Sequence, residues 1–176
     1  IARLLNNQTP IQIGVGMHTG PLIMGITGDK DRMDACTISD TVNTASRLEG
    51  LTKHYKTSII LSDASLEQIN NKENFHLRNL GMVQLKGKQE SIKIHECFSG
   101  NTPKDIQKKA ATLSLFNEGI SHYLDKSFNK AHEVFMQVIN ENPEDRTAAF
   151  FFTNTKQVME EGFSKNREGI VEMQEK

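Results

Sequence analysis

Residues 39–50 read Ser39-Asp-Thr-Val-Asn43-Thr-Ala-Ser-Arg47-Leu-Glu-Gly50. Ser39 and Asp40 are both good helix N-cap residues, because their side-chain oxygens can accept hydrogen bonds from the free N–H groups of a first turn. A helix is therefore predicted to begin here and to run to about residue 55. Its inward side is expected to carry the apolar residues at helical spacing, which are Val42, Ala45 and Leu48.

On this predicted helix Asn43 and Arg47 are four residues apart, so their side chains project from one face as neighbours. A carboxamide can hold the hydroxyl groups of a sugar, and a planar guanidinium can bind two oxygens of one phosphate. The pair therefore suits a nucleotide. For Arg47 the alternative is a surface arginine that pairs with a local acid such as Glu49.

The composition describes a polar chain with a modest core. The 176 residues suffice for one domain, or for one domain plus an appendage, with 36% hydrophobic residues and a mean hydropathy of -0.50. The 21 basic and 22 acidic residues give a net charge of -1. Since no overall field of either sign results, we expect no nucleic acid as partner.

Two further features indicate the compartment and the extent of the chain. Cys36 and Cys97 form no Cys-x-x-Cys pair and are expected to be thiols of a reducing compartment. No apolar run reaches the roughly 18 residues of a membrane span, and no signal peptide is recognised. Because the first residue is Ile1 rather than Met, we expect a piece of a longer protein, located in the cytoplasm or on the cytoplasmic side of a membrane protein.

Strands and helices alternate up to about residue 100, which predicts an α/β (α+β) layer structure. Apolar residues at positions 11, 13 and 15 alternate with polar or small ones, as in a strand with one buried face. Further strands are predicted at 21–26, 33–38, 58–61, 82–85 and 91–97, with a small helix at 62–69.

After residue 100 the strand signals stop, and an all-α helical-hairpin tail is predicted over residues 101–176. Helices are expected at 111–124, 129–140 and 146–159, with 104–109 as a solvated linker. Small, aromatic and breaker residues fall where a tetratricopeptide hairpin has them, at Gly119, Phe128, Ala131, Phe135 and Pro143. The tail could therefore bind a protein partner.

Three blocks within residues 1–100 together resemble the class III adenylate and guanylate cyclases. They are Gly14-Val-Gly-Met-His18-Thr-Gly20, Asp40-Thr-Val-Asn43-Thr-Ala-Ser-Arg47-Leu-Glu49 and Leu85-Lys86-Gly87. Their spacing fits as well as their content. The resemblance covers only the C-terminal half of that catalytic domain, and it implies a head-to-tail homodimer with sites at the interface.

The resemblance implies a role for four residues. These enzymes convert a nucleoside triphosphate into its 3′,5′-cyclic monophosphate and pyrophosphate. By resemblance, Asn43 orients the ribose, Arg47 stabilises charge on the α-phosphate, Lys86 holds the terminal phosphates and Cys36 contacts the base. A solvated lysine and a buried apolar cysteine are the structural alternatives for Lys86 and Cys36.

The chain departs from the family at the metal site. The family's Mg²⁺ or Mn²⁺ ions are held by two aspartates that lie upstream of these blocks, in a half that this chain lacks. No metal ligand is therefore assigned, and the piece alone is expected to be inactive.

The base preference stays open between ATP and GTP. Cys36 is typical of guanylate cyclases, whereas the residues around it look more like those of bacterial enzymes that use ATP. An alternative function is a degenerate cyclase-like regulatory module that binds a nucleotide or a partner without chemistry.

Overall fold

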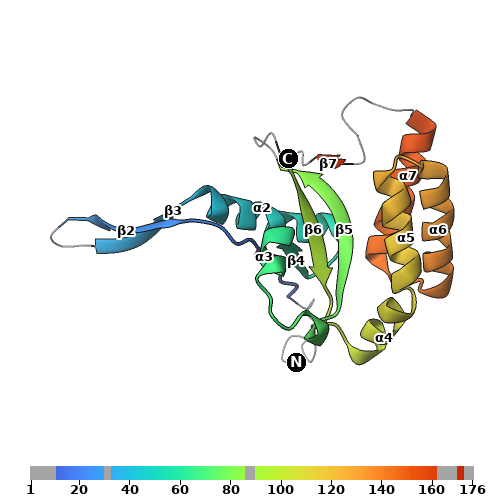
Figure 1. The fold of residues 1–176 in the computed structure, drawn as a ribbon, viewed down its shortest axis with the longest axis horizontal. Helices are drawn as coiled ribbons and strands as arrows, with labels where there is room; N and C mark the ends of the chain where they lie inside the picture. Colours follow the sequence, from blue (N-terminus) through green and yellow to red (C-terminus); the bar gives the residue numbers. More distant parts are fainter. Residues whose placement is uncertain (1–10, 30–32, 86–89, 162–169, 173–176) are drawn as a thin grey trace.

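The computed structural model describes residues 11–29, 33–85, 90–161 and 170–172. A mixed five-stranded sheet forms the centre, a two-stranded hairpin projects from one side of it, and a group of helices lies on the other side (Figure 1). This mixed α/β arrangement agrees with the sequence prediction.

The five-stranded sheet has the order β1-β4-β6-β5-β7. Strand β1 (Val15–Met17) is parallel to β4 (Ile59–Ser62), and β6 (Ser91–Cys97) is antiparallel to both β4 and β5 (Leu77–Gln84). Strand β7 (Ile170–Glu172) pairs in parallel with β5. Among the described strands, β1 therefore forms one edge of the sheet.

Helix α2 (Asp40–Tyr55) is the predicted central helix, with Ser39 as its N-cap. The Ser39 hydroxyl accepts a hydrogen bond from the Val42 N–H at 3.1 Å, and the helix ends at Lys56 in the left-handed region (φ 57°). Its buried face consists of Thr44, Leu48, Leu51, Thr52 and Tyr55. The prediction of Val42 on the inward side is wrong, because Val42 lies across the helix from this row and is 40% exposed.

Strand β1 begins later than predicted, and its buried face is the opposite one. Ile11, Ile13 and Val15 are 69%, 74% and 40% exposed. The face toward α2 carries glycines instead: a Cβ on Gly16 would lie 2.2 Å from the Ala45 carbonyl oxygen and 2.2 Å from the Glu49 nitrogen. The predicted alternation of the strand is present, but the helix approaches so closely that only residues without a side chain fit on the inward face.

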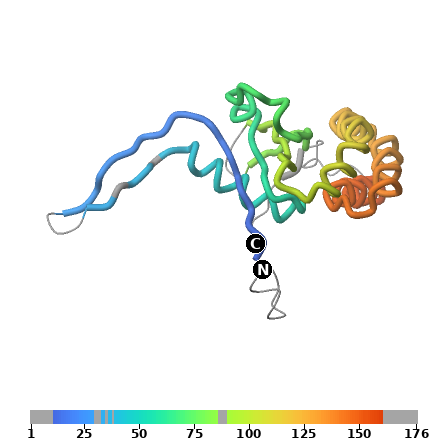
Figure 2. Tube along the Cα trace, turned by 90° about the horizontal axis from the view of Figure 1, so that it is seen from below, coloured from blue at the N-terminus to red at the C-terminus, as the bar shows by residue number. Residues whose placement is uncertain are grey.

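The hairpin consists of β2 (Ile23–Gly28) and β3 (Met33–Ile38), both close to their predicted ranges. All residues of β2 are exposed, and the hairpin extends away from the sheet as an arm (Figures 1 and 2). After β4 come the short helix α3 (Asp63–Glu67), which begins and ends within the predicted range and has Ser62 as its N-cap, and the 3-10 turn η1 (Lys72–Asn74).

Four helices follow the sheet: α4 (Pro103–Ala111), α5 (Leu113–Leu124), α6 (Phe128–Glu141) and α7 (Arg146–Glu161). The prediction of 104–109 as a solvated linker is wrong. Thr102 caps α4, Pro103 occupies its first turn, and the lysines pair with acids distant in sequence, Lys108 with Glu144 and Lys109 with Glu96.

One hydrophobic core joins the sheet and these helices. Helix α5 covers β5, where a Cβ on Gly81 (φ 88°) would lie 3.6 Å from Leu124. The ring of Tyr55 in α2 lies 5.0 Å from that of Phe150 in α7, and Phe151 is fully enclosed. Between α5 and α6, Gly119 lies directly under the Phe135 ring.

A buried ionic network also connects the sheet to the helices. Arg78 of β5 donates to Glu96 of β6 (Nε–Oε2, 2.5 Å) and to both carboxylate oxygens of Asp145 (2.6 and 3.0 Å), the residue before α7. Lys109 binds the second oxygen of Glu96 at 2.6 Å. The Arg78 guanidinium lies 4.0 Å from the centre of the Phe116 ring. Since Arg78 and Asp145 are fully buried, each depends on the other for its charge.

Candidate functional site

Helix α2 presents Asn43 and Arg47 on a flank next to its buried row. Asn43 is exposed and Arg47 is partly exposed, while Thr44 and Leu48 beside them are buried. The structure thus places the amide and the guanidinium one turn apart on an accessible surface of a helix fixed by its other face. The separation by one turn follows from the helix that the sequence predicted.

Cys36 lies in β3, three residues before the N-cap of α2, and its side chain is partly buried. Its partner across the hairpin is Gly25, and a Cβ on Gly25 would meet nothing within 4 Å. The neighbourhood of Cys36 on the hairpin therefore has open space.

Lys86 lies outside the described residues, so its predicted position relative to Asn43 and Arg47 is not described. The residues that precede it are described: β5 ends at Gln84, and Leu85 is buried with 1% exposure.

A cavity of about 460 Å³ lies where β1 exits toward the hairpin and α2 begins. It is lined by residues 18–23 and by Ser39, Asp40 and Thr41. The Thr41 hydroxyl donates to the Pro21 carbonyl at 2.6 Å and connects the two sides. Neither Asn43, Arg47 nor Cys36 lines this cavity. The sequence identified Ser39 and Asp40 only as helix caps, and no signal indicated that they also border a hollow.

Polar contacts hold the exit of β1 against α3. His18 Nδ1 lies 2.8 Å from the Ser62 hydroxyl, and the Thr19 hydroxyl lies 3.1 Å from that of Ser65.

A second histidine pairs with the first residue of α3. His95 Nε2 is 2.7 Å from Asp63 Oδ1. Burial lowers the pKa of His95 below its ordinary value although the carboxylate opposes this, and the hydrogen bond from His95 lowers the pKa of Asp63.

The described residues contain no group of three or more His, Cys, Asp and Glu side chains that could hold a metal ion. No residue of the described chain is therefore assigned to Mg²⁺ or Mn²⁺. No helix in the described ranges is both long and apolar enough to cross a bilayer.

The comparisons with known proteins identify the class. The family model for the adenylate and guanylate cyclase catalytic domain matches residues 2–98. The chain therefore belongs to this family, the class III nucleotide cyclases, whose activity is that of a phosphorus–oxygen lyase. The three sequence blocks that suggested the resemblance all lie within the matched residues.

Relatives include both adenylate and guanylate cyclases. The terminal-differentiation-specific adenylate cyclase of Dictyostelium discoideum is 30% identical over 142 residues, covering 80% of this chain and 7% of that protein. The adenylate cyclase of Anabaena cylindrica is 41% identical (49% of this chain, 17% of that protein), and the beta-2 subunit of rat soluble guanylate cyclase is 42% identical (45% and 11%). The chain thus spans only a small part of the relatives that it matches.

Two solved structures are also similar. The adenylyl cyclase CyaB from P. aeruginosa is 28% identical with a TM-score of 0.45, covering 55% of this chain and 47% of that one. A bacterial light-regulated adenylyl cyclase is 25% identical with a TM-score of 0.41, covering 54% and 45%.

Proposed function

We propose that this chain is the C-terminal half of the catalytic domain of a purine nucleotide cyclase, which converts ATP or GTP to the 3′,5′-cyclic monophosphate and pyrophosphate. The observation that carries the proposal is the pair Asn43 and Arg47, presented one turn apart on the accessible flank of a helix that is fixed by its other face. Family membership gives this pair its chemical context.

In the proposed reaction the ribose 3′-oxygen attacks the α-phosphorus, the bond to the bridging oxygen breaks, and pyrophosphate leaves. Asn43 holds the ribose so that the 3′-oxygen is in line. Arg47 neutralises the charge that develops on the α-phosphate, and an arginine in such a position can contribute roughly 10³ to 10⁵ in rate. Lys86 would hold the terminal phosphates as a mobile point charge.

Cys36 is the proposed contact to the base, supported by the open space beside Gly25 across the hairpin. We propose ATP as the first substrate, because the residues around Cys36 resemble those of bacterial enzymes that use ATP. Relatives of both specificities match the chain, so GTP is the second substrate to test.

We infer that the metal-binding half precedes this chain and completes the sheet at β1. Among the described strands β1 is at the edge of the sheet, edge strands are sites for strand addition, and Val15 and Met17 on β1 are 40% and 47% exposed. Bound Mg²⁺ or Mn²⁺ would neutralise the triphosphate and activate the 3′-hydroxyl, with ligands in that upstream half.

The full-length protein is proposed to act as a homodimer. The arm formed by β2 and β3 carries several strongly exposed apolar side chains, including Ile23, Met24, Ile26 and Met33 at 71–75% exposure. Apolar surface of this extent favours a covering partner, and a second copy of the chain would supply it.

The segment 101–176 is proposed as a tetratricopeptide-like region that docks a protein partner and regulates the catalytic domain. Two observations support it. Gly119 allows α5 and α6 to pack closely at the Phe135 ring. The alignment with the Dictyostelium cyclase spans 142 residues, more than the 98 at which the family match ends, so it extends into these helices.

The test is cyclase activity of a protein that contains this chain and its upstream half. Arg47→Ala should lower kcat with ATP at least about tenfold, since one donor to a developing anion is lost. Ser46→Ala, on the same exposed flank but without an assigned contact, is the matched control. Full activity of Arg47→Ala would contradict the role of Arg47, and binding of ATP without any turnover in the intact protein would favour the regulatory module instead.

A further inference from the structure

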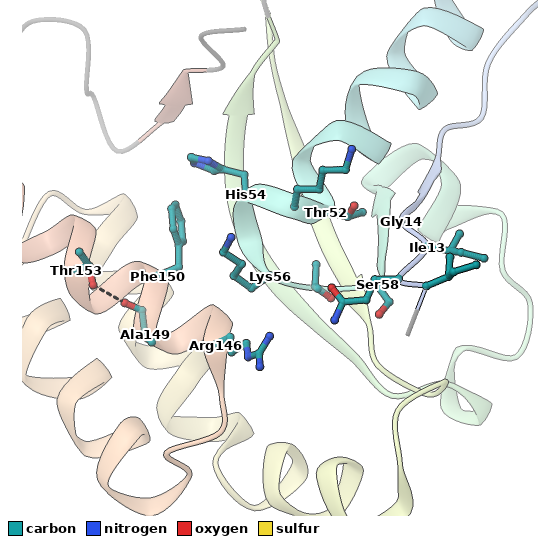
Figure 3. Close-up of a pocket in the computed structure, with 14 residues that line it drawn as sticks. Ile13, Gly14, Thr52, His54, Lys56, Ser58, Arg146, Ala149, Phe150 and Thr153 are labelled. Atoms are coloured by element: carbon teal, nitrogen blue, oxygen red, sulfur yellow. Dashed lines mark hydrogen bonds between the residues drawn. The ribbon is translucent and has the colours of Figure 1, made fainter. Parts of the chain in front are cut away.

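A second cleft lies where the C-terminal end of α2 faces the beginning of α7 (Figure 3). Its volume is about 1200 Å³. One wall comes from residues 11–14, 52–54 and 56–58, and the other comes from α7. It shares no lining residue with the cavity at the exit of β1.

The charged residues that line this cleft are all basic. Lys53 and Lys56 come from the end of α2 and the turn after it, and Arg146 comes from the first turn of α7. No carboxylate of the described residues pairs with any of the three within 4.0 Å. The Glu49 Oε1 atom would lie 3.0 Å from a Cβ on Gly14, but Glu49 is not among the residues that line the cleft. Cations from two facing walls repel each other, and a bound anion would relieve this repulsion.

The rest of the lining adds an aromatic surface and polar groups. Phe150 of α7 faces the end of α2, and its ring centre lies 4.7 Å from that of His54 (Figure 3). Burial and the charge of Lys56 lower the pKa of His54. Its imidazole nitrogens can take part in hydrogen bonds. Gln12 and Ser58 also line the cleft. Residues 1–10, next to this wall in sequence, contain one arginine and no acid, so they supply no counter-charge.

We propose that this cleft binds a small compound with a multiply charged phosphate group, held by Lys53, Lys56 and Arg146, with its remaining part against Phe150. The cleft is large enough for such a ligand, since small-molecule sites typically measure about 300 to 1,000 Å³. Because the three cations belong to the catalytic half and to the helical segment, the ligand would bridge them. The proposal does not depend on cyclase activity.

Isothermal titration of the full chain in EDTA tests the proposal, with sodium tripolyphosphate and ATP as probes. Without divalent metal, binding at a metal-dependent catalytic site is suppressed. We expect one site, and Lys53→Gln/Arg146→Gln should weaken it at least about tenfold, since charge-assisted bonds to phosphate are lost. Lys104→Gln/Lys130→Gln removes the same charge from exposed positions elsewhere and should bind as the parent chain does. Absence of binding, or equal loss in both double variants, would overturn the proposal.

Further variants separate the possible ligands and sites. Tighter binding of ATP than of tripolyphosphate, with the difference removed by Phe150→Leu, indicates a nucleotide, whereas equal binding indicates an inorganic polyphosphate. Lys56→Asn should also weaken binding and should fold, because asparagine tolerates the left-handed backbone at this position (φ 57°). If Arg47→Ala abolishes binding while the Lys53/Arg146 variant retains it, the ligand occupies the catalytic surface and the proposal is wrong.

Discussion

At the scale of single residues, the position of α2 depends on the absence of a side chain at one residue of β1. Gly16 has no side chain, and the backbone of α2 fills the space where one would be. The helix that carries Asn43 and Arg47 therefore lies as close to the sheet as backbone contact allows. A methyl group at this point would displace the helix rather than a flexible side chain.

We predict that Gly16→Ala destabilises the chain by about 1–3 kcal/mol or more, because overpacking against backbone cannot be relieved by a rotamer change. Gly25→Ala is the matched control, since its Cβ would meet nothing within 4 Å. Urea unfolding followed by circular dichroism measures both. Equal stability of the two variants would show that α2 can move away from β1 at little cost.

At the scale of elements, sequence patterns were reliable where the signal is local. The range of α2 followed from Ser39 and a 3.6-residue period, and α3 lies within the range predicted for a small helix. The buried face of β1 and the helix α4 could not be predicted in this way. The first depends on a helix that passes over the glycines, and the second on the pairing of Lys108 and Lys109 with acids far along the chain.

The candidate site was predictable to a similar degree. The i, i+4 relation of Asn43 and Arg47 is a local property of one helix, and the structure has it. The distance from this pair to Lys86 depends on how β5 and α2 pack, which no local pattern encodes. The cleft between α2 and α7 joins residues more than 80 positions apart and gave no sequence signal.

The arm formed by β2 and β3 allows a prediction for assembly. In the full-length protein, Ile23→Thr/Ile26→Thr should weaken dimerisation at least about tenfold, because apolar area is lost while the strand preference of a β-branched residue is kept. Analytical ultracentrifugation measures the dissociation constant. Met136→Thr, at an exposed apolar position of α6, serves as control. An unchanged dissociation constant would exclude the arm from the interface.

At the scale of the whole molecule, Arg78 connects the strands to the helices. It contacts Glu96 in the sheet and Asp145 at the start of α7, and it lies over the Phe116 ring of α5. Burial disfavours the charge of Asp145, but the hydrogen bonds and charge of Arg78 outweigh this and lower its pKa. Asp145 therefore contributes stability above its ordinary pKa of 3.8, which is lost as the pH falls through the lower folded value.

Asp145→Asn should cost about 3–5 kcal/mol at pH 7, because Arg78 is left buried without its full counter-charge. The variant should also lose less stability than the parent chain between pH 4 and pH 2, since the group that titrates there has been removed. Urea unfolding at the three pH values measures both effects. An acid dependence identical to that of the parent chain would contradict the role of Asp145.

Because the sheet and the helices share one core, the chain cannot be divided between them without loss of stability. Cutting the backbone after Gly100 would remove Phe150 and Phe151 from Tyr55 in one product, and Phe116 and Phe151 would lose part of their covering in the other. Neither product would keep a hydrophobic core shielded from water, so both should aggregate when produced separately. Fusion proteins or chimeric cyclases that include this helical segment would also have to include the strands on which it packs.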